Sequence, residues 1–330
     1  MHFGFGPREL LMLQLFYSPD STHNSYSISD AARKMGVSVP VVSRVASSLE
    51  KKGFFEIRRA GKRKVISFSN APHVTALIQL TTESQHVELE KVLSDSAVRV
   101  LSGMLNPPVS VGTISRIART PEITVRRMLS KLLEKGVVAR PKRSEYRIIL
   151  PRLQDFIEEY SKHVLRGKIA GMRGVFNPRW PNAVFRTTEQ PKDFMTLTGI
   201  SIFHKYGIKI IQTDSRDCYF NAFDDKPKKP MLEEAVVHAL TWTVKNSSAR
   251  ETSYSMLVAH RNWEKFDRNK FVEIAKEWGV QSVAERCVNL VESFENDERW
   301  PDPRPAGRVY VEGPVFPSWE EFTDLVKQYE

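Results

Sequence analysis

Cysteine is scarce in this chain of 330 residues, and its scarcity argues against two classes of protein. Cys218 and Cys287 lie far apart, and neither belongs to a CxxC or CxxH pair. A disulfide-held domain needs several cysteines, and a structural zinc site needs ligands at short spacing. We therefore expect two buried free thiols, no disulfide scaffold and no metal site.

Long apolar runs are also missing. The longest, at residues 10–16, is far shorter than the roughly 20 residues that cross a bilayer, so we expect no membrane segment. The first residues, MHFGFGPREL, lack a basic start followed by a long apolar stretch. A secretory signal is therefore not expected, and the cytoplasm is the expected location.

The common catalytic motifs are absent too: the sequence contains no P-loop, GxGxxG, HExxH or GxSxG, and its eight histidines show no ligand spacing. One charged stretch leaves a metal-dependent nuclease open as an alternative, since carboxylates bind Mg²⁺. It contains Asp214, Asp217, Asp224, Asp225, Lys226, Lys228 and Lys229. Its end, DDKPKKP, is typical of a solvated turn. We predict a protein that is not an enzyme and needs no cofactor.

Positive charge is concentrated in one half of the chain. Residues 1–150 contain 23 Lys and Arg against 12 Asp and Glu, a net charge of +11, whereas residues 151–330 contain 26 against 27. This asymmetry indicates a half that binds a polyanion, joined to a half with another task.

One phrase occurs twice in the basic half. Residues 49–55 read LEKKGFF and residues 132–138 read LLEKGVV, with Gly53 and Gly136 at 83 residues' separation. Upstream of each phrase, two short helices are expected, the second with apolar residues at helical spacing on one face. Those residues are Val42, Val45, Ala46 and Leu49 in the first copy, and Val125, Met128, Leu129 and Leu132 in the second.

Each copy also contains expected N-cap residues at its helix starts and an expected hairpin after its glycine. Ser27, with Asp30 three residues later, and Ser38 are expected to cap the two helices of the first copy. In the second copy Thr120 is expected to cap, with Pro121 as the first helical residue. Two apolar-alternating runs follow each glycine, which predicts a hairpin with basic residues near its tip.

Both copies, residues 7–69 and 95–150, resemble winged helix-turn-helix domains of the MarR and ArsR kind. The resemblance rests on the order helix, Gly turn, helix with an outward Arg, LExxG and basic hairpin. It implies that the second helix reads base edges in the major groove while the hairpin contacts phosphates or the minor groove. Such domains also serve as protein-interaction modules, and that alternative stays open, more so for the second copy.

The predicted DNA-contacting residues are those left on the outer face of each second helix and on each hairpin. In the first copy they are Ser38, Pro40, Ser43, Arg44, Ser47, Arg58, Arg59, Lys62, Arg63 and Lys64. In the second copy they are Thr124, Arg126, Arg127, Ser130, Lys131, Lys142 and Arg143, beside Arg140. Arg44 and Arg127 are equivalent in the repeat, and either guanidinium can pair bidentately with guanine.

The expected fold class is α+β, mainly helical, with four parts. These are a first winged helix (1–70), a helical linker (71–94), a second winged helix (95–150) and a mixed C-terminal domain (151–330). The linker is expected to be one long or broken helix, serving as a dimer contact or a simple spacer. In the C-terminal domain we expect a loop at NPRWPN (177–182), a helix over 194–206 and strands over 208–213 and 218–223.

The C-terminal region is also similar to AbiEi-type proteins, through LTGISIFHKYGI (197–208), LEEAVVHAL (232–240) and the segment 251–280. Those proteins are winged-helix repressors that act as antitoxins beside a nucleotidyltransferase toxin, although this chain departs from them in having two winged helices. The sequence therefore predicts a repressor that binds double-stranded DNA and occludes a promoter. A homodimer and a nucleotidyltransferase-type toxin are its expected protein partners.

Overall fold

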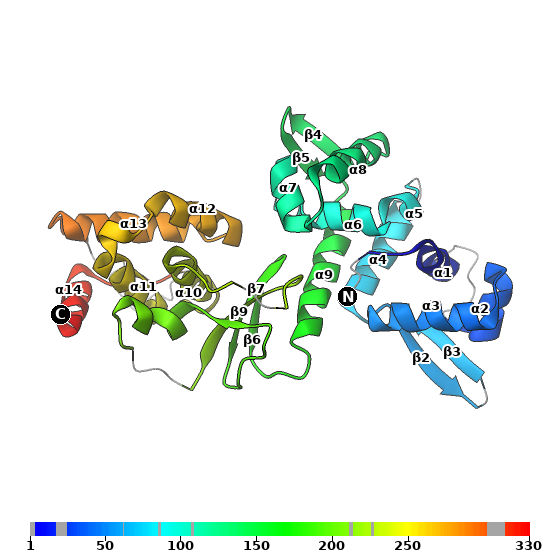
Figure 1. The fold of residues 1–330 in the computed structure, drawn as a ribbon, viewed down its shortest axis with the longest axis horizontal. Coiled ribbons are helices and arrows are strands. Elements are labelled where there is room, and N and C mark those ends of the chain that lie inside the picture. Colours follow the sequence, from blue (N-terminus) through cyan, green and yellow to red (C-terminus); the bar gives the residue numbers. More distant parts are fainter. Residues whose placement is uncertain are drawn as a thin grey trace. The chain divides into compact units, whose positions relative to one another are not determined.

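The computed structural model describes residues 4–17, 25–61, 63–84, 87–106, 109–210, 214–225, 228–301 and 314–330. The fold is α+β and mainly helical, as the sequence predicted (Figure 1). It divides into two compact units, Met1–Lys168 and Ile169–Glu330.

The first copy folds as helices followed by a β-hairpin. Its elements are α1 (Pro7–Tyr17), β1 (Ser25–Ser27), α2 (Ile28–Met35), α3 (Val39–Lys51), β2 (Phe55–Ala60) and β3 (Arg63–Phe68), with β3 central in an antiparallel sheet of order β1-β3-β2. The predicted inner face of α3 is buried throughout. Ser27 caps α2 as predicted, because its Oγ accepts a hydrogen bond of 3.1 Å from the N–H of Asp30.

The second copy repeats this plan with a shorter hairpin. It contains α6 (Asp95–Ser102), α7 (Val111–Ala118), α8 (Glu122–Glu134), β4 (Val138–Lys142) and β5 (Glu145–Ile148), and the predicted inner face of α8 is buried. The predicted start of α8 is wrong by one residue, since Pro121 is the N-cap. Thr120 does not cap the helix, because its hydroxyl is buried and donates to the carbonyl of Ala118 at 3.0 Å.

The repeated phrase builds the same helix ending in both copies. The N–H of Phe54 donates to the carbonyl of Leu49, and the N–H of Gly53 donates to the carbonyl of Glu50, each at 2.9 Å. Val137 and Gly136 make the equivalent bonds to Leu132 and Leu133, at 3.2 and 3.0 Å. This is the Schellman pattern, which needs a left-handed residue after the helix, and the two glycines have φ of +76° and +66°. The phrase recurs because it ends a helix and directs the chain into a hairpin.

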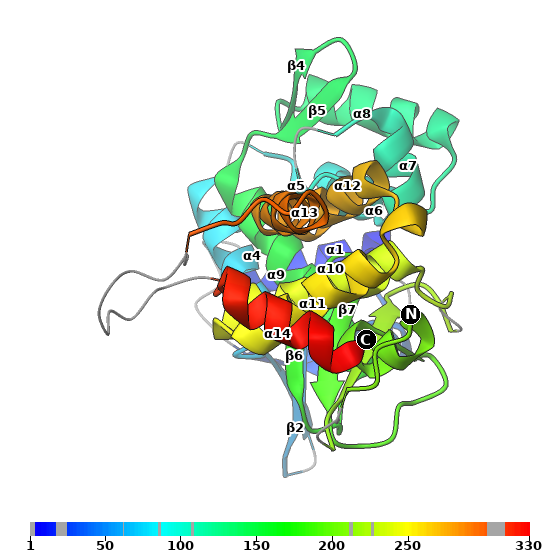
Figure 2. The ribbon, with the colours of Figure 1, turned by 90° about the vertical axis from the view of Figure 1, so that its left-hand side faces the viewer.

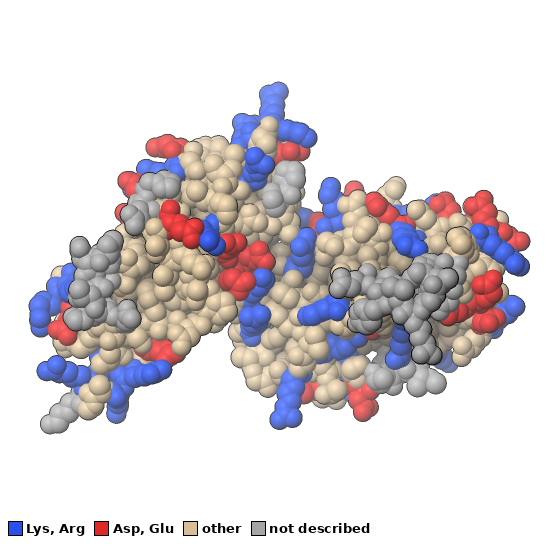
Figure 3. Space-filling model, turned by 180° about the vertical axis from the view of Figure 1, so that it is seen from behind, with Lys and Arg blue, Asp and Glu red and all other residues tan. Residues whose placement is uncertain are grey.

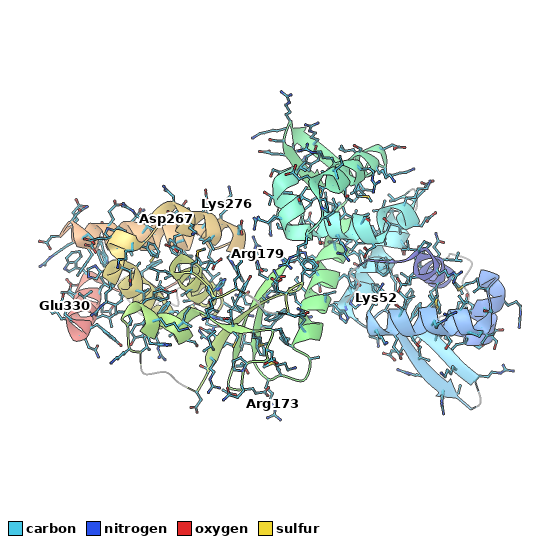
Figure 4. All side chains as sticks on the ribbon, in the orientation of Figure 1. Lys52, Arg173, Arg179, Asp267, Lys276 and Glu330 are labelled. Atoms are coloured by element: carbon cyan, nitrogen blue, oxygen red, sulfur yellow. The ribbon has the colours of Figure 1, made fainter. Side chains whose placement is uncertain are left out.

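In each copy, the lysine directly before the glycine forms an ion pair with a glutamate that lies earlier in the chain. Lys52, labelled in Figure 4, is buried, and its Nζ lies 2.7 Å from Oε2 of Glu9 and 2.6 Å from the carbonyl oxygen of Gly4. The pKa of Glu9 would rise through burial, but hydrogen bonds from Lys52, Gly6 and Ser48 outweigh this effect and lower it. The equivalent Lys135 pairs with Glu88 at 2.8 Å in an exposed position.

The linker and the helix after the second copy pack together in the N-terminal unit. They comprise α4 (Pro72–Glu83), α5 (Leu89–Val92) and α9 (Pro151–Lys168), so the linker helix is broken. Helix α4 contacts α9 along its length, and Tyr160 stacks among Phe54, His73 and Phe156. The first unit therefore extends to Lys168 rather than to the predicted boundary at 150, because the apolar face of α9 completes its core.

His73 should make the first unit sensitive to acid. Its ring is fully buried, 4.2 Å from that of His163 between centroids, and neither ring nitrogen has a hydrogen bond of normal geometry to any described residue. Burial, with His163 adding to it and the Lys52 backbone opposing it, lowers the pKa of His73 to about 3. Since the unfolded imidazole titrates near 6.5, protonation favours unfolding. The contribution of neutral His73 to the free energy of unfolding is fully present above pH 6.5 and is lost as the pH falls toward the folded pKa.

We expect His73→Phe to remove about 2 kcal/mol of the stability difference between pH 7 and pH 5, because phenylalanine fills the site without titrating. Urea unfolding followed by circular dichroism measures the difference. All six tryptophans lie in the second unit (Trp180, Trp242, Trp263, Trp278, Trp300 and Trp319), so tryptophan fluorescence provides an internal control that the substitution should leave unchanged. An equal acid loss in the variant by circular dichroism would contradict the assignment.

The second unit combines a small sheet with a helical layer. The sheet contains β6 (Val175–Arg179), β7 (Asn182–Thr187), β8 (Thr196–Leu197) and β9 (Arg216–Asn221) in the order β6-β7-β9-β8. The helices are η1 (Gly199–Tyr206), α10 (Leu232–Asn246), α11 (Ala249–Arg261), η2 (Trp263–Lys265), α12 (Arg268–Trp278), α13 (Gln281–Glu295) and α14 (Trp319–Tyr329). Helix α14 lies against α11 (Figure 2), and Ser318 and Glu321 form the predicted capping box at its start.

Three sequence expectations for this unit are wrong. The predicted loop at 177–182 is largely the β6–β7 hairpin, in which Pro178 is tolerated because β6 is an edge strand. The predicted helix over 194–206 is instead β8 followed by the 3₁₀ helix η1, because Gly199 has a φ of +55° that no helix interior adopts. Of the predicted strands, residues 208–210 are not a strand, 211–213 lie outside the described residues, and β9 accounts for the second.

Candidate nucleic-acid interface

The outer face of α3 presents the residues predicted to read DNA. Pro40 and Arg44 are exposed, and Ser43 and Ser47 are half-buried beside them. Together with Ser48 and Lys51 they line one shallow hollow on the protein surface. Ser48 and Lys51 were not predicted, although their positions four residues beyond Arg44 and Ser47 place them on the same face.

The start of α3 is suited to a phosphate. Ser38 is its N-cap residue, yet the side chain makes no capping hydrogen bond within the described chain, and the first turn contains no acidic residue. The first N–H groups of a helix lack partners inside the helix, and the helix dipole favours an anion there. Pro40 has no N–H, however, and the N–H of Val41 already donates to the carbonyl of Ser38 at 3.0 Å. The first turn of α3 therefore favours an anion through the helix dipole and the absence of a carboxylate, and not through a row of free amides.

The first hairpin, β2 with β3, carries four described exposed cations: Arg58, Arg59, Arg63 and Lys64. Arg58 pairs with Glu56, whereas Arg59 lies directly opposite Lys64 in the strand register. Like charges placed opposite each other destabilise a hairpin, so this pair is not explained by stability. Lys and Arg gather at this tip, at the lower left in Figure 3. Lys62, predicted to contribute, lies outside the described residues.

The predicted contact residues of the second copy are largely exposed, but many have local partners. Thr124 is half-buried, and Arg126, Arg127, Ser130 and Lys131 are exposed on α8. Arg126 pairs with Glu122 at 2.9 Å in the first turn, where that carboxylate competes with any phosphate. The Oγ of Ser130 donates to the carbonyl of Arg126 at 3.1 Å.

The second hairpin, β4 with β5, shows the same local pairing. The guanidinium of Arg140 donates to the carbonyl of Arg143, and Lys142 lies 3.8 Å from Glu145. At the start of α8, Ile123 is 79% exposed in the position equivalent to Pro40. An apolar side chain there suits a base methyl group or a protein better than a phosphate. The first copy therefore offers the better polyanion surface.

The structure also shows where the two cysteines and the buried carboxylate of the nuclease alternative lie. Cys218 and Cys287 are buried free thiols, as expected, and burial raises the pKa of each to about 12. Asp217, one of the carboxylates behind the nuclease alternative, is buried in an ion pair with Arg186. Within the described ranges, no group of three or more His, Cys, Asp or Glu side chains is arranged to hold a metal ion. None of the helices seen in the described part is both long and apolar enough to cross a membrane.

Comparison with known proteins gives one family match. Residues 192–330 match the family model HVO_2833_C, described as a C-terminal domain. The match covers less than half of the chain and does not reach the candidate interface. No curated protein matches the sequence.

Proposed function

We propose that the N-terminal unit binds double-stranded DNA through α3 and the first hairpin, and that the protein regulates transcription by occupying a promoter. The observation that supports this most is that one small domain carries both an open polar helix face and a cationic hairpin. A helix leaves Ser43, Arg44 and Ser47 on an open face, and a hairpin on the same domain carries opposed cations that cost stability. The helix suits base edges and the hairpin suits phosphates.

The surface of the second copy is compatible with either of two roles. It is either a second, weaker DNA contact or a protein-binding module, and the exposed Ile123 beside the Glu122–Arg126 pair favours protein. The second unit is then the part available for a homodimer. The AbiEi resemblance supplies a partner to test by co-purification, a nucleotidyltransferase-type toxin.

Arg44→Ala tests the reading role of α3. We expect it to lose about 1 to 3 kcal/mol of discrimination at one base pair, since a bidentate arginine–guanine contact supplies specificity of that size. Competition binding with single-base variants of a preferred duplex measures the loss. Lys276→Ala, at an exposed position of the second unit, is the control that should leave discrimination unchanged. If Arg44→Ala lowered affinity equally for every sequence, Arg44 would be a phosphate contact and α3 would not read bases through it.

A further inference from the structure

Exposed apolar side chains lie at matching places in the two copies. Val39 is 47% exposed in the first turn of α3, and Ile123 is 79% exposed in the first turn of α8. Pro40, which follows Val39, is exposed too and occupies the position equivalent to Ile123. A single exposed apolar residue is ordinary on a protein surface. Its recurrence in the same helical turn of both copies, however, is a feature of the repeat.

Neither Val39 nor Pro40 is explained by the packing of α3 or by a phosphate contact. The buried face of the helix does not include them, and acidic residues stabilise a first turn better than a β-branched side chain does. Proline suits the start of a helix, but it has no N–H, and neither side chain carries a hydrogen-bond donor. These two residues therefore offer a duplex only apolar surface.

The two side chains border the polar part of the outer face of α3. Pro40 lines the surface hollow together with Ser43 and Arg44. Val39 lies four residues before Ser43, which places both on the same side of the helix. The outer face thus has an apolar edge, formed by Val39 and Pro40, next to a guanidinium and a hydroxyl group.

The major groove of DNA presents one apolar group that fits this edge. Base edges there carry hydrogen-bond donors and acceptors, and the C5 methyl group of thymine is the exception. The first residues of a helix that lies in the groove meet these base edges. The exposed cations of the first hairpin, with no acidic residue in the first turn of α3, favour an anionic partner over an apolar protein surface.

We propose that the apolar edge of α3 reads the methyl group of thymine, which makes Val39 and Pro40 specificity-determining residues. This inference rests on the proposed DNA binding through α3. Val39 precedes Arg44 by five residues, about 7.5 Å along the helix axis at 1.5 Å per residue. Successive base pairs are about 3.4 Å apart, so the thymine lies within roughly two to three base pairs of a guanine bound by Arg44.

DNA that contains uracil tests the proposal, because uracil is thymine without the methyl group. The full chain is titrated against the duplex upstream of its own gene, prepared either with thymine or with uracil at every thymine position, and fluorescence anisotropy gives both Kd values. We expect the wild-type chain to bind the thymine duplex roughly three- to tenfold more tightly, as burial of a methyl group predicts. The ratio of the two Kd values should be equal at 50 and 200 mM salt, since a methyl contact releases no counterion.

Two variants assign the effect to the apolar edge. The double variant Val39→Ser with Pro40→Ser should bring the ratio close to one and keep the wild-type salt slope, because it removes apolar surface and no charge. Val244→Ser is the matched control, since Val244 lies on α10 of the second unit and is also 47% exposed. It should keep the wild-type ratio.

The possible outcomes separate thymine reading from DNA binding itself. Equal affinity of the wild-type chain for both duplexes would overturn thymine reading and leave DNA binding by α3 standing. A thymine preference that persists in the double variant would do the same, because the methyl group would then be read elsewhere. Absence of binding to either duplex would overturn both proposals and assign the apolar edge to a protein partner.

Discussion

Duplex binding is expected to lose most of its salt dependence when the exposed cations of the first hairpin are replaced. The variant carries four substitutions: Arg58→Gln, Arg59→Gln, Arg63→Gln and Lys64→Gln. Each phosphate contact contributes about 0.9 to the slope of log K against log salt. The loss of four contacts makes the slope shallower by about 3.6. The factor by which affinity falls between 50 and 200 mM salt should therefore be roughly a hundredfold smaller in the variant than in the wild-type chain.

A matched variant separates this local effect from net charge. Lys205, Lys265, Lys276 and Lys327 are exposed in the second unit, and their replacement by Gln changes the total charge equally. We expect that control to bind with nearly the wild-type slope. Fluorescence anisotropy with a random-sequence duplex measures both. Equal slopes for the wild-type chain and the hairpin variant would show that β2 and β3 do not contact phosphates.

Lys52→Met is expected to destabilise the first unit by about 3 to 5 kcal/mol. The substitution leaves the carboxylate of Glu9 buried without its cation, and an uncompensated charge is costly in an apolar interior. Urea unfolding followed by circular dichroism reports the change, while tryptophan fluorescence reports the second unit and should not move.

The repeat supplies the control for this prediction. Lys135→Met breaks the equivalent pair with Glu88, which is exposed, so it should have a much smaller effect. The double variant Glu9→Met with Lys52→Met should be more stable than Lys52→Met alone, because no charge is then left buried. A loss for Lys52→Met no greater than that for Lys135→Met would mean that the Glu9 pair is not buried in solution.

Local features of the first unit were predictable from sequence because they depend on neighbours along the chain. Apolar residues at helical spacing gave the buried faces of α3 and α8, and the repeated glycine marked both helix ends. The place of α9 was not predictable. Its apolar spacing shows one buried face but not which helix covers that face, and α4 lies some 70 residues earlier in the sequence.

The ion pairs that Arg186 makes in the second unit show where sequence reasoning fails. From the sequence, Asp217 was considered as a carboxylate of a charged stretch and a candidate Mg²⁺ ligand, and not as part of an ion pair. Its partner Arg186 lies 31 residues earlier, and Glu251, which also pairs with that arginine, lies 65 residues after it. Pairing of β7 with β9 brings Arg186 and Asp217 together, and helix α11 adds Glu251.

The most direct test of DNA binding is a salt series with the full chain. Binding is measured from 50 to 200 mM salt without Mg²⁺, on a random duplex and on the duplex upstream of the protein's own gene. We predict tight binding at low salt that falls by about a thousandfold over this range, as expected for roughly six phosphate contacts, with a preference for the upstream sequence. Absence of binding to either duplex at any salt would contradict the account and assign the hairpin domains to protein contacts.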